Sequence, residues 1–198
     1  MFTYRGIILA LSLAFGMGIQ AAMADTCGLD KTSVQVSWTA YKTTQKTPVG
    51  GTFKKVDVVG VTSAPDLMTL AKGLEFVIDK TSVDSKNPGR DQTLTESFFS
   101  VLKGDIRGKI TAVDMASHQL ILHLQLNGKA LDLPLQYEMV GQKFSAKGNM
   151  DILAFAGDSA LQSLNKKCFD LHKGADGVSK TWSEVGLMVT GTLLGQCH

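Results

Sequence analysis

The chain has 198 residues, of which 44% are hydrophobic and 19% charged, and its formal net charge is +2. This length and composition suit a single globular domain with a sizeable core. Basic and acidic residues are interspersed without a basic stripe, which argues against a nucleic-acid partner.

The first 24 residues have the pattern of a secretory signal peptide. Arg5 precedes an apolar run over 7–19, and Ala22-Met23-Ala24 is a small-x-small cleavage site. An uncleaved membrane anchor is the alternative, but the run is short for a span of about 20 apolar residues. Cys27 lacks the preceding lipobox of a lipoprotein. We therefore expect residues 25–198 to be an exported domain without stable membrane insertion.

Alternating segments indicate β-strands from the start of the mature chain. Residues 34–41 alternate apolar and polar, a Thr/Lys/Pro/Gly loop spans 43–51, and a second strand spans 52–60. Ser63 and Pro65 predict the start of a short helix that ends at Gly73.

A further strand follows at 74–79, where Leu74, Phe76 and Ile78 share one face. A Ser/Asp/Asn/Pro/Gly turn comes next, then Arg90-Asp91 and a short segment that ends in Phe98-Phe99.

The clearest pattern predicts an antiparallel hairpin between 118 and 137. The even-numbered leucines of 120–126 share one face, and Asn127-Gly128 is the preferred type I′ turn. Pro134 in the return strand indicates an edge or a bulge, because proline donates no backbone hydrogen bond. Further strands are expected at 105–115 and 142–151.

The C-terminal part contains a helical pattern and a last strand. Asp158 is expected to cap a helix in which Leu161, Leu164, Cys168 and Leu171 recur at helical spacing. A polar loop at 173–180 leads to a strand at 185–194. The fold class is therefore all-β with short helices, as an antiparallel sheet closed into a barrel or folded into a sandwich. An eight-stranded barrel has room for packed side chains or one small ligand.

Several segments together resemble the YceI-like family. The most specific is Ser82-Val83-Asp84 through Arg90-Asp91 to Phe98-Phe99, and the others are Trp38 to Lys42 with Val49 to Phe53, Gly128 to Leu135, and Trp182 to Val185. The similarity spans roughly 33–194. It departs from the family pattern after Phe99 and in the added helix near 160–172.

The resemblance implies a periplasmic, lipocalin-like, eight-stranded antiparallel β-barrel that binds long apolar molecules in its interior. Apolar ligand pockets are lined by aromatic and aliphatic side chains. The alternative for each position is an ordinary packed core. The candidate lining consists of Trp38, Phe53, Phe76, Ile78, Phe98, Phe99, Leu120, Leu122, Leu124, Leu133, Leu135 and Phe144.

Polar residues near the expected barrel mouth are candidates for contact with a ligand headgroup. Arg90 and Asp91 follow the turn, and Lys42 lies at the end of the first strand. Arginine suits a phosphate because its fork donates two parallel hydrogen bonds. The competing interpretation is that Arg90 and Asp91 brace the turn.

Three cysteines remain in the mature chain, and export favours a disulfide. Cys168–Cys197 is the expected pair, and Cys27–Cys197 is the alternative. Cys168 and His172 with Cys197-His198 would suit zinc, but adjacent ligands at a chain terminus are poorly held, so no metal is expected.

No catalytic motif is present in the sequence, and no cofactor or reaction is predicted. The expected function is sequestration or carriage of an apolar lipid, such as an isoprenoid, a quinone precursor or a fatty acid derivative. The alternative is a non-catalytic interaction module whose barrel is filled by its own side chains. A homodimer is left open.

Overall fold

The computed structural model describes residues 26–197, so the expected signal peptide and His198 lie outside it. None of the helices within that range has the length and apolarity needed to cross a bilayer. The strands and helices in chain order are β1 (Cys27–Lys42), β2 (Thr47–Phe53), β3 (Val56–Gly60), β4 (Ser63–Ala64), α1 (Leu67–Gly73), β5 (Leu74–Ile78), η1 (Lys80–Ser82), β6 (Val83–Asp84), α2 (Pro88–Leu94), η2 (Thr95–Phe99), β7 (Ile106–Asp114), β8 (Gln119–Leu126), β9 (Lys129–Val140), β10 (Lys143–Asp151), η3 (Ile152–Phe155), α3 (Asp158–Lys167), η4 (Asp170–His172) and β11 (Thr181–Gly195).

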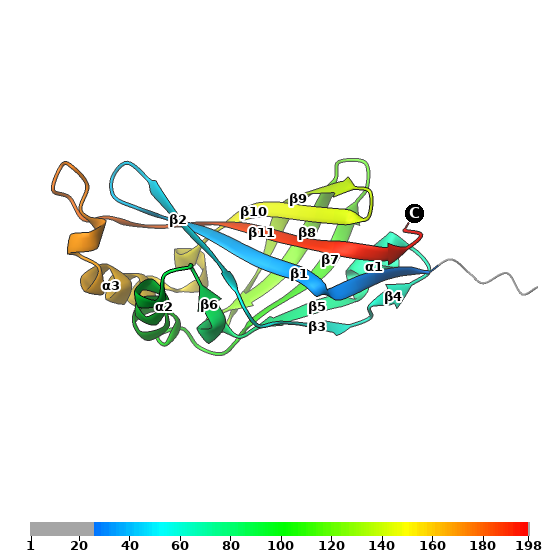
Figure 1. Cartoon of the computed structure of the whole chain (residues 1–198), viewed down its shortest axis with the longest axis horizontal. Helices are drawn as coiled ribbons and strands as arrows, with labels where there is room; N and C mark the ends of the chain where they lie inside the picture. Colours follow the sequence, from blue (N-terminus) through cyan, green and yellow to red (C-terminus); the bar gives the residue numbers. More distant parts are fainter. Residues whose placement is uncertain (1–25, 198) are drawn as a thin grey trace, which may run out of the picture.

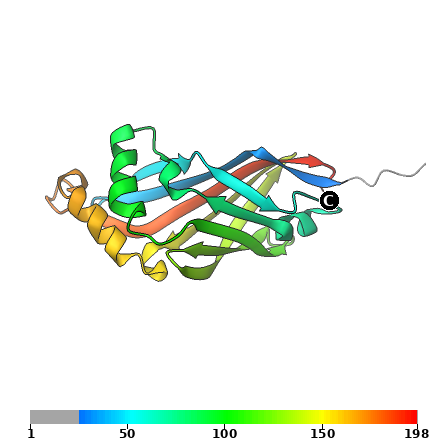
Figure 2. The ribbon, with the colours of Figure 1, turned by 90° about the horizontal axis from the view of Figure 1, so that it is seen from below.

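The strands form one antiparallel sheet that curls around an interior (Figures 1 and 2). Their order is β3-β5-β7-β8-β9-β10-β11-β1-β2-β6, and β4 pairs with β1. The antiparallel β class is confirmed, but the sheet has eleven strands and not eight. Two of the strands are two-residue segments, namely β6 at one end of this order and β4, which lies off it and pairs with β1.

The two ends of the sheet are connected by the bend between β2 and β3, and these two strands do not pair with each other through a ladder of backbone hydrogen bonds. β2 pairs with β1, whereas β3 pairs with β5. Two residues, Lys54 and Lys55, separate β2 from β3. At the bend, the Lys54 amide donates to the Ser82 carbonyl at 2.9 Å, and the Lys55 carbonyl accepts from the Asp79 amide at 3.2 Å. The structure is therefore a strongly curled half-barrel.

The hairpin of β8 and β9 forms as its sequence predicts. Asn127 and Gly128 have φ values of 52° and 74°, as a type I′ turn requires. The pairing of β9 with β10 ends at Gln136–Lys147, so Pro134 lies in the part of β9 that pairs with β8 alone. Proline costs no ladder hydrogen bond there.

Three helix starts differ from expectation. α1 begins after Asp66, whose carboxylate accepts from the Thr69 amide at 2.7 Å, while Ser63 pairs with Gly28 in the sheet. The expected turn before Phe98 contains α2, because Asn87 caps its start and a proline suits the first helical position. α3 starts at Asp158 itself, which follows Gly157 as the capping residue.

The helices lie at the two ends of the curl, with α1 at one end and α2 and α3 at the other (Figures 1 and 2). The main core cluster lies inside the sheet, and a second, smaller cluster gathers beside α1. Leu70 of α1 and Cys27 of β1 are both fully buried in that second cluster. The α1 end is therefore closed by close packing.

The expected disulfide Cys168–Cys197 is wrong, because Cys197 is bonded to Cys27 and Cys168 is a buried free thiol. The reason is topological. β1 pairs antiparallel with β11 in a register that sets Cys27 opposite Gly195, so both ends of the described chain meet beside α1. Cys168 ends α3, at the opposite end of the molecule (Figure 1).

Replacing the Cys27–Cys197 pair by serines should lower the free energy of unfolding by about 3–5 kcal/mol, because the bridge closes a loop of 170 residues in the unfolded chain. Urea unfolding with and without reductant measures this difference. Cys168→Ser should leave the sensitivity to reductant intact. Loss of that sensitivity in Cys168→Ser would contradict the pairing.

Candidate functional site

An apolar cavity of about 210 Å³ lies inside the curled sheet. It extends from Leu70 and Ala71 of α1 to Leu161 and Leu164 of α3, along the long axis of the molecule. An engineered cavity of about 150 Å³ lined by similar side chains stays dry and takes up benzene. The cavity therefore has space for part of an apolar ligand before any side chain moves.

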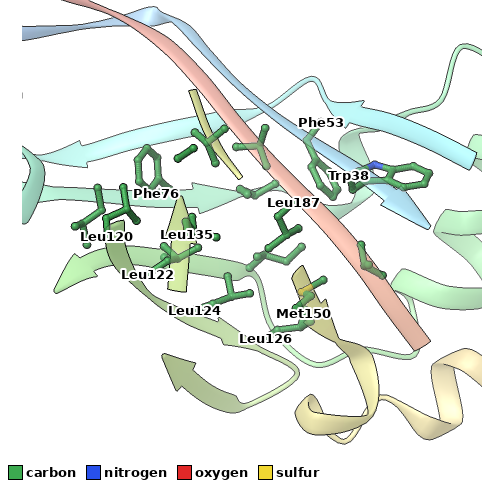
Figure 3. A pocket seen from close by; sticks show the side chains of 18 of the residues that line it. Trp38, Phe53, Phe76, Leu120, Leu122, Leu124, Leu126, Leu135, Met150 and Leu187 are labelled. Carbon is green, nitrogen blue, oxygen red and sulfur yellow. The ribbon is translucent and has the colours of Figure 1, made fainter. Parts of the chain in front are cut away.

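The structure brings eleven of the twelve candidate lining residues to this cavity (Figure 3). Leu133 is the exception, since it packs against the main core cluster without bordering the cavity. The eleven are Trp38, Phe53, Phe76, Ile78, Phe98, Phe99, Leu120, Leu122, Leu124, Leu135 and Phe144.

Three aromatic rings form the wall near α2. Phe99 meets Phe53 edge to face at 5.8 Å between ring centroids and Phe98 at 5.2 Å. Phe98 and Phe99 belong to η2, a π-helical turn in which the Ser100 amide donates to the Thr95 carbonyl at 3.0 Å. The pair of phenylalanines that carries the family resemblance therefore caps the cavity.

Other lining residues come from elements that the sequence located without assigning them to a site. Alternation along β11 sets Val185, Leu187 and Val189 in the wall, and the helical spacing of Leu161 and Leu164 sets α3 over one end. Period-two alternation along 185–194 would have found the first group. The α1 contribution carried no such signal, because only the folded sheet brings that helix to the cavity.

The polar groups of the lining are largely satisfied within the protein. The Tyr137 hydroxyl donates to Met115 Sδ at 3.2 Å, and Trp182 Nε1 donates to the Thr43 carbonyl at 2.8 Å. Burial raises the pKa of Tyr137, with Asp114 adding to the shift. Trp38 Nε1 is buried without a partner among residues 26–197. No charged side chain of the described residues lines the cavity.

The three candidate rim residues do not line the cavity. Asp91 Oδ1 accepts from the amide and the hydroxyl of Ser85, at 2.7 and 2.6 Å, so it braces α2 against the segment after β6. Lys42 Nζ donates to the Leu171 carbonyl at 3.3 Å. Arg90 is exposed on α2. Contact of Arg90 or Lys42 with a headgroup stays a prediction.

Asp84 holds the start of the same segment. Its side chain is largely buried and accepts from Lys86 through the amide at 3.0 Å and the ammonium at 2.8 Å. The Lys86 side chain and then its amide hold the pKa of Asp84 below 3.8, and Lys54 at 3.7 Å adds to this. Asp84 and Asp91 therefore both hold the segment 85–86, which leads into α2 and then to Phe98 and Phe99 of η2.

Cys168 and His172 lie close to the far end of the cavity, but no metal cluster forms among residues 26–197. Burial raises the pKa of the Cys168 thiol. Burial also lowers the pKa of the His172 imidazole, and the positive charge of Lys42 lowers it further. The imidazole is held by Thr181 Oγ1 at 2.6 Å from Nδ1, and Cys197 is used in the disulfide. The Cys27–Cys197 disulfide therefore removes Cys197 from the set of ligands that Cys168 and His172 were considered to share.

A curled antiparallel sheet around an apolar interior is a lipocalin-like fold. The sequence matches the model of the YceI-like domain over residues 28–190, and the chain belongs to this family. A comparison with curated proteins finds no match.

Two similar solved structures support the fold. A polyisoprenoid-binding domain from Saccharophagus degradans, implicated in plant cell wall breakdown, has a TM-score of 0.59 at 14% identity, covering 86% of this chain and 98% of that one. BcnA of Burkholderia cenocepacia has a TM-score of 0.56 at 15% identity, covering 84% and 99%. At these identities the likeness shows the fold.

Asp84 should titrate below its ordinary pKa in the folded protein. Since the folded pKa is lower than the unfolded one, the stabilisation by this carboxylate is present above about pH 4 and is lost as the pH falls through the folded pKa. Carboxyl ¹³C NMR measures the pKa, and urea unfolding should show the advantage over Asp84→Asn shrinking below about pH 4. A pH-independent advantage would rule out the ionic contribution.

Proposed function

We propose that the protein is an exported, non-catalytic carrier that sequesters one long apolar molecule in its cavity. The observation that carries the proposal is the continuous cavity itself, with no charged side chain among its lining residues. The alternative, an interaction module with a filled barrel, has no need of such a space. The family membership supports the same conclusion.

The binding would be driven by the hydrophobic effect. Burial contributes about 0.8 kcal/mol per methylene, so a five-carbon isoprene unit adds up to about 4 kcal/mol. Side chains such as Met139 and Met150 are flexible and can adapt to the width of a chain. An isoprenoid, a quinone precursor or a fatty acid derivative meets these demands, and the similarity to a polyisoprenoid-binding domain favours the first.

Two features support export. The first 24 residues have the pattern of a cleaved signal peptide, and the Cys27–Cys197 disulfide suits an oxidising compartment such as the periplasm. Sequestration outside the cytoplasm would let the protein carry a water-insoluble molecule across an aqueous space.

Native mass spectrometry of the protein purified from its own compartment tests the proposal, followed by organic extraction of anything bound. We expect one apolar molecule per chain. A clean apo mass that persists after incubation with geranylgeraniol and palmitic acid would contradict carriage and favour the filled-barrel module.

Bulkier side chains in the cavity should weaken the uptake of ligand. Met150→Trp or Met139→Trp adds bulk at lining positions, so we expect at least about a tenfold loss of geranylgeraniol binding, as the ligand loses burial equivalent to two or more methylenes. Met68→Trp, on the exposed face of α1 outside the lining, is the matched control. Circular dichroism checks folding, and equal binding by all three variants would exclude this cavity as the site.

A further inference from the structure

The two ends of the cavity are built differently. At the α1 end, Leu70 is fully buried and the Cys27–Cys197 disulfide ties β1 to the segment after β11. Partly buried residues line both ends of the cavity, with Leu67 and Ala71 on α1 and with Leu161, Thr181 and Trp182 on the other side. Among residues 26–197 only the α1 end is tied by a disulfide, since Cys168 near the second end is a free thiol.

Two loops project side by side at the second end (Figure 1). The β1–β2 turn and the segment before β11 are joined by backbone and side-chain bonds. The Thr43 amide donates to the Lys180 carbonyl at 2.9 Å, and Thr44 Oγ1 donates to Asp176 at 2.6 Å. These bonds make the two loops one surface.

Large apolar side chains are exposed on this surface. Phe169, Leu171 and Val178 are 51%, 71% and 51% exposed. The spacing of the apolar residues in the sequence predicts Leu171 on the buried face of the helix. The helix α3 ends at Lys167, however, and the Leu171 side chain lies outside the core. Exposure of three such residues in one short segment is costly in water and indicates an interaction surface.

Lysines are frequent in the segments that carry these apolar side chains, and Lys173 Nζ lies 4.8 Å from the centroid of the Phe169 ring. Residues 42–46 and 165–184 contain six lysines and three acidic residues, which leaves fourteen basic and fifteen acidic residues in the rest of the chain. Two of the acids are paired, Glu184 with Lys46 at 2.8 Å and Asp170 with Lys173 at 2.6 Å. We call this surface the lysine face; it comprises Lys42, Lys46, Lys166, Lys167, Phe169, Leu171, Lys173, Val178 and Lys180.

The lysine face is continuous with the cavity. Lys46 and Lys180 each place Nζ over the Trp182 ring, at 4.7 and 4.2 Å from its centroid, and Trp182 also lines the cavity. Leu164, one turn before Cys168, lines it from α3. A chain that leaves the cavity at this end emerges among the exposed apolar side chains.

We propose that the lysine face docks on the surface of an anionic phospholipid bilayer, so that the apolar chain passes between bilayer and cavity without crossing water. Phe169, Leu171 and Val178 would enter the acyl boundary, while the lysine stems extend along it and place their ammonium groups among the phosphates. The exchange role rests on the proposed carrier function, whereas docking stands on the lysine face alone.

The charge argues for a bilayer over a protein partner of mixed charge. Each lysine near an anionic surface strengthens binding about fivefold, and the attraction falls with added salt. The α1 end also exposes apolar side chains, including Val61 and Leu194, but residues 57–75 around it contain three acidic residues and a single lysine, Lys72. That end therefore serves as a control of matched exposure.

The test is co-sedimentation of the mature protein with vesicles of phosphatidylethanolamine and phosphatidylglycerol, compared with neutral phosphatidylcholine vesicles. We expect salt-sensitive binding to the anionic vesicles. Phe169→Ser with Leu171→Ser should weaken it about tenfold, and Lys166→Gln with Lys167→Gln about fivefold per lysine. The controls Val61→Ser with Leu194→Ser, and Lys143→Gln with Lys147→Gln on β10, should bind as the wild type does.

Uptake of geranylgeraniol separates docking from carriage. Phe169→Ser with Leu171→Ser should take up the alcohol from ethanol as the wild type does, yet extract it from anionic vesicles more slowly. Absence of vesicle binding, equal binding to neutral vesicles, equal loss in the control pairs, or a dimer that depends on Phe169 and Leu171 would each overturn the proposal. Docking by a wild type that takes up no alcohol from either source would overturn the exchange role and the carrier function together.

Discussion

The pairing of β1 with β11 is the interaction on which the rest of the molecule depends. Its register runs from Cys27–Gly195 to Lys42–Thr181, so it joins the first and last strands over nearly their full length. One end of this ladder forms the disulfide beside α1, and the other sets the β1–β2 turn against the loop before β11. The cavity lies between these two fixed ends.

The shape of the interior depends on small residues as well as on the backbone ladders. One such residue is Gly51, which allows Trp38 of β1 to approach β2. Trp38 lies over Gly51 of β2, where a Cβ atom would come within 2.6 Å of the indole ring and 2.8 Å of the Asp84 carbonyl. A side chain at Gly51 would push Trp38 away from the wall. Glycine at this position therefore lets the Trp38 ring approach the backbone of β2 closely.

The sequence was most informative where the signal was local. Alternation along β8 and the Asn127-Gly128 turn predicted a hairpin and the leucines that line the cavity, because strand periodicity and turn geometry are properties of neighbouring residues. It failed where distant segments meet. The partner of Cys197 follows from the register between β1 and β11, which a short stretch of sequence does not reveal. The start of α1 depends on whether Ser63 or Asp66 caps the helix, and a short stretch of sequence does not decide between them.

The pairing of β1 with β11 also determines how late in synthesis and folding the sheet can form. The ladder cannot form, and neither the cavity nor the disulfide can exist, until residues 181–197 are available to pair with residues 27–42. Contacts of such long sequence separation make folding slow. A sheet built this way completes its cavity last, because β11 supplies Val185, Leu187 and Val189 to the lining and can pair with β1 only after the C-terminal segment has been synthesised.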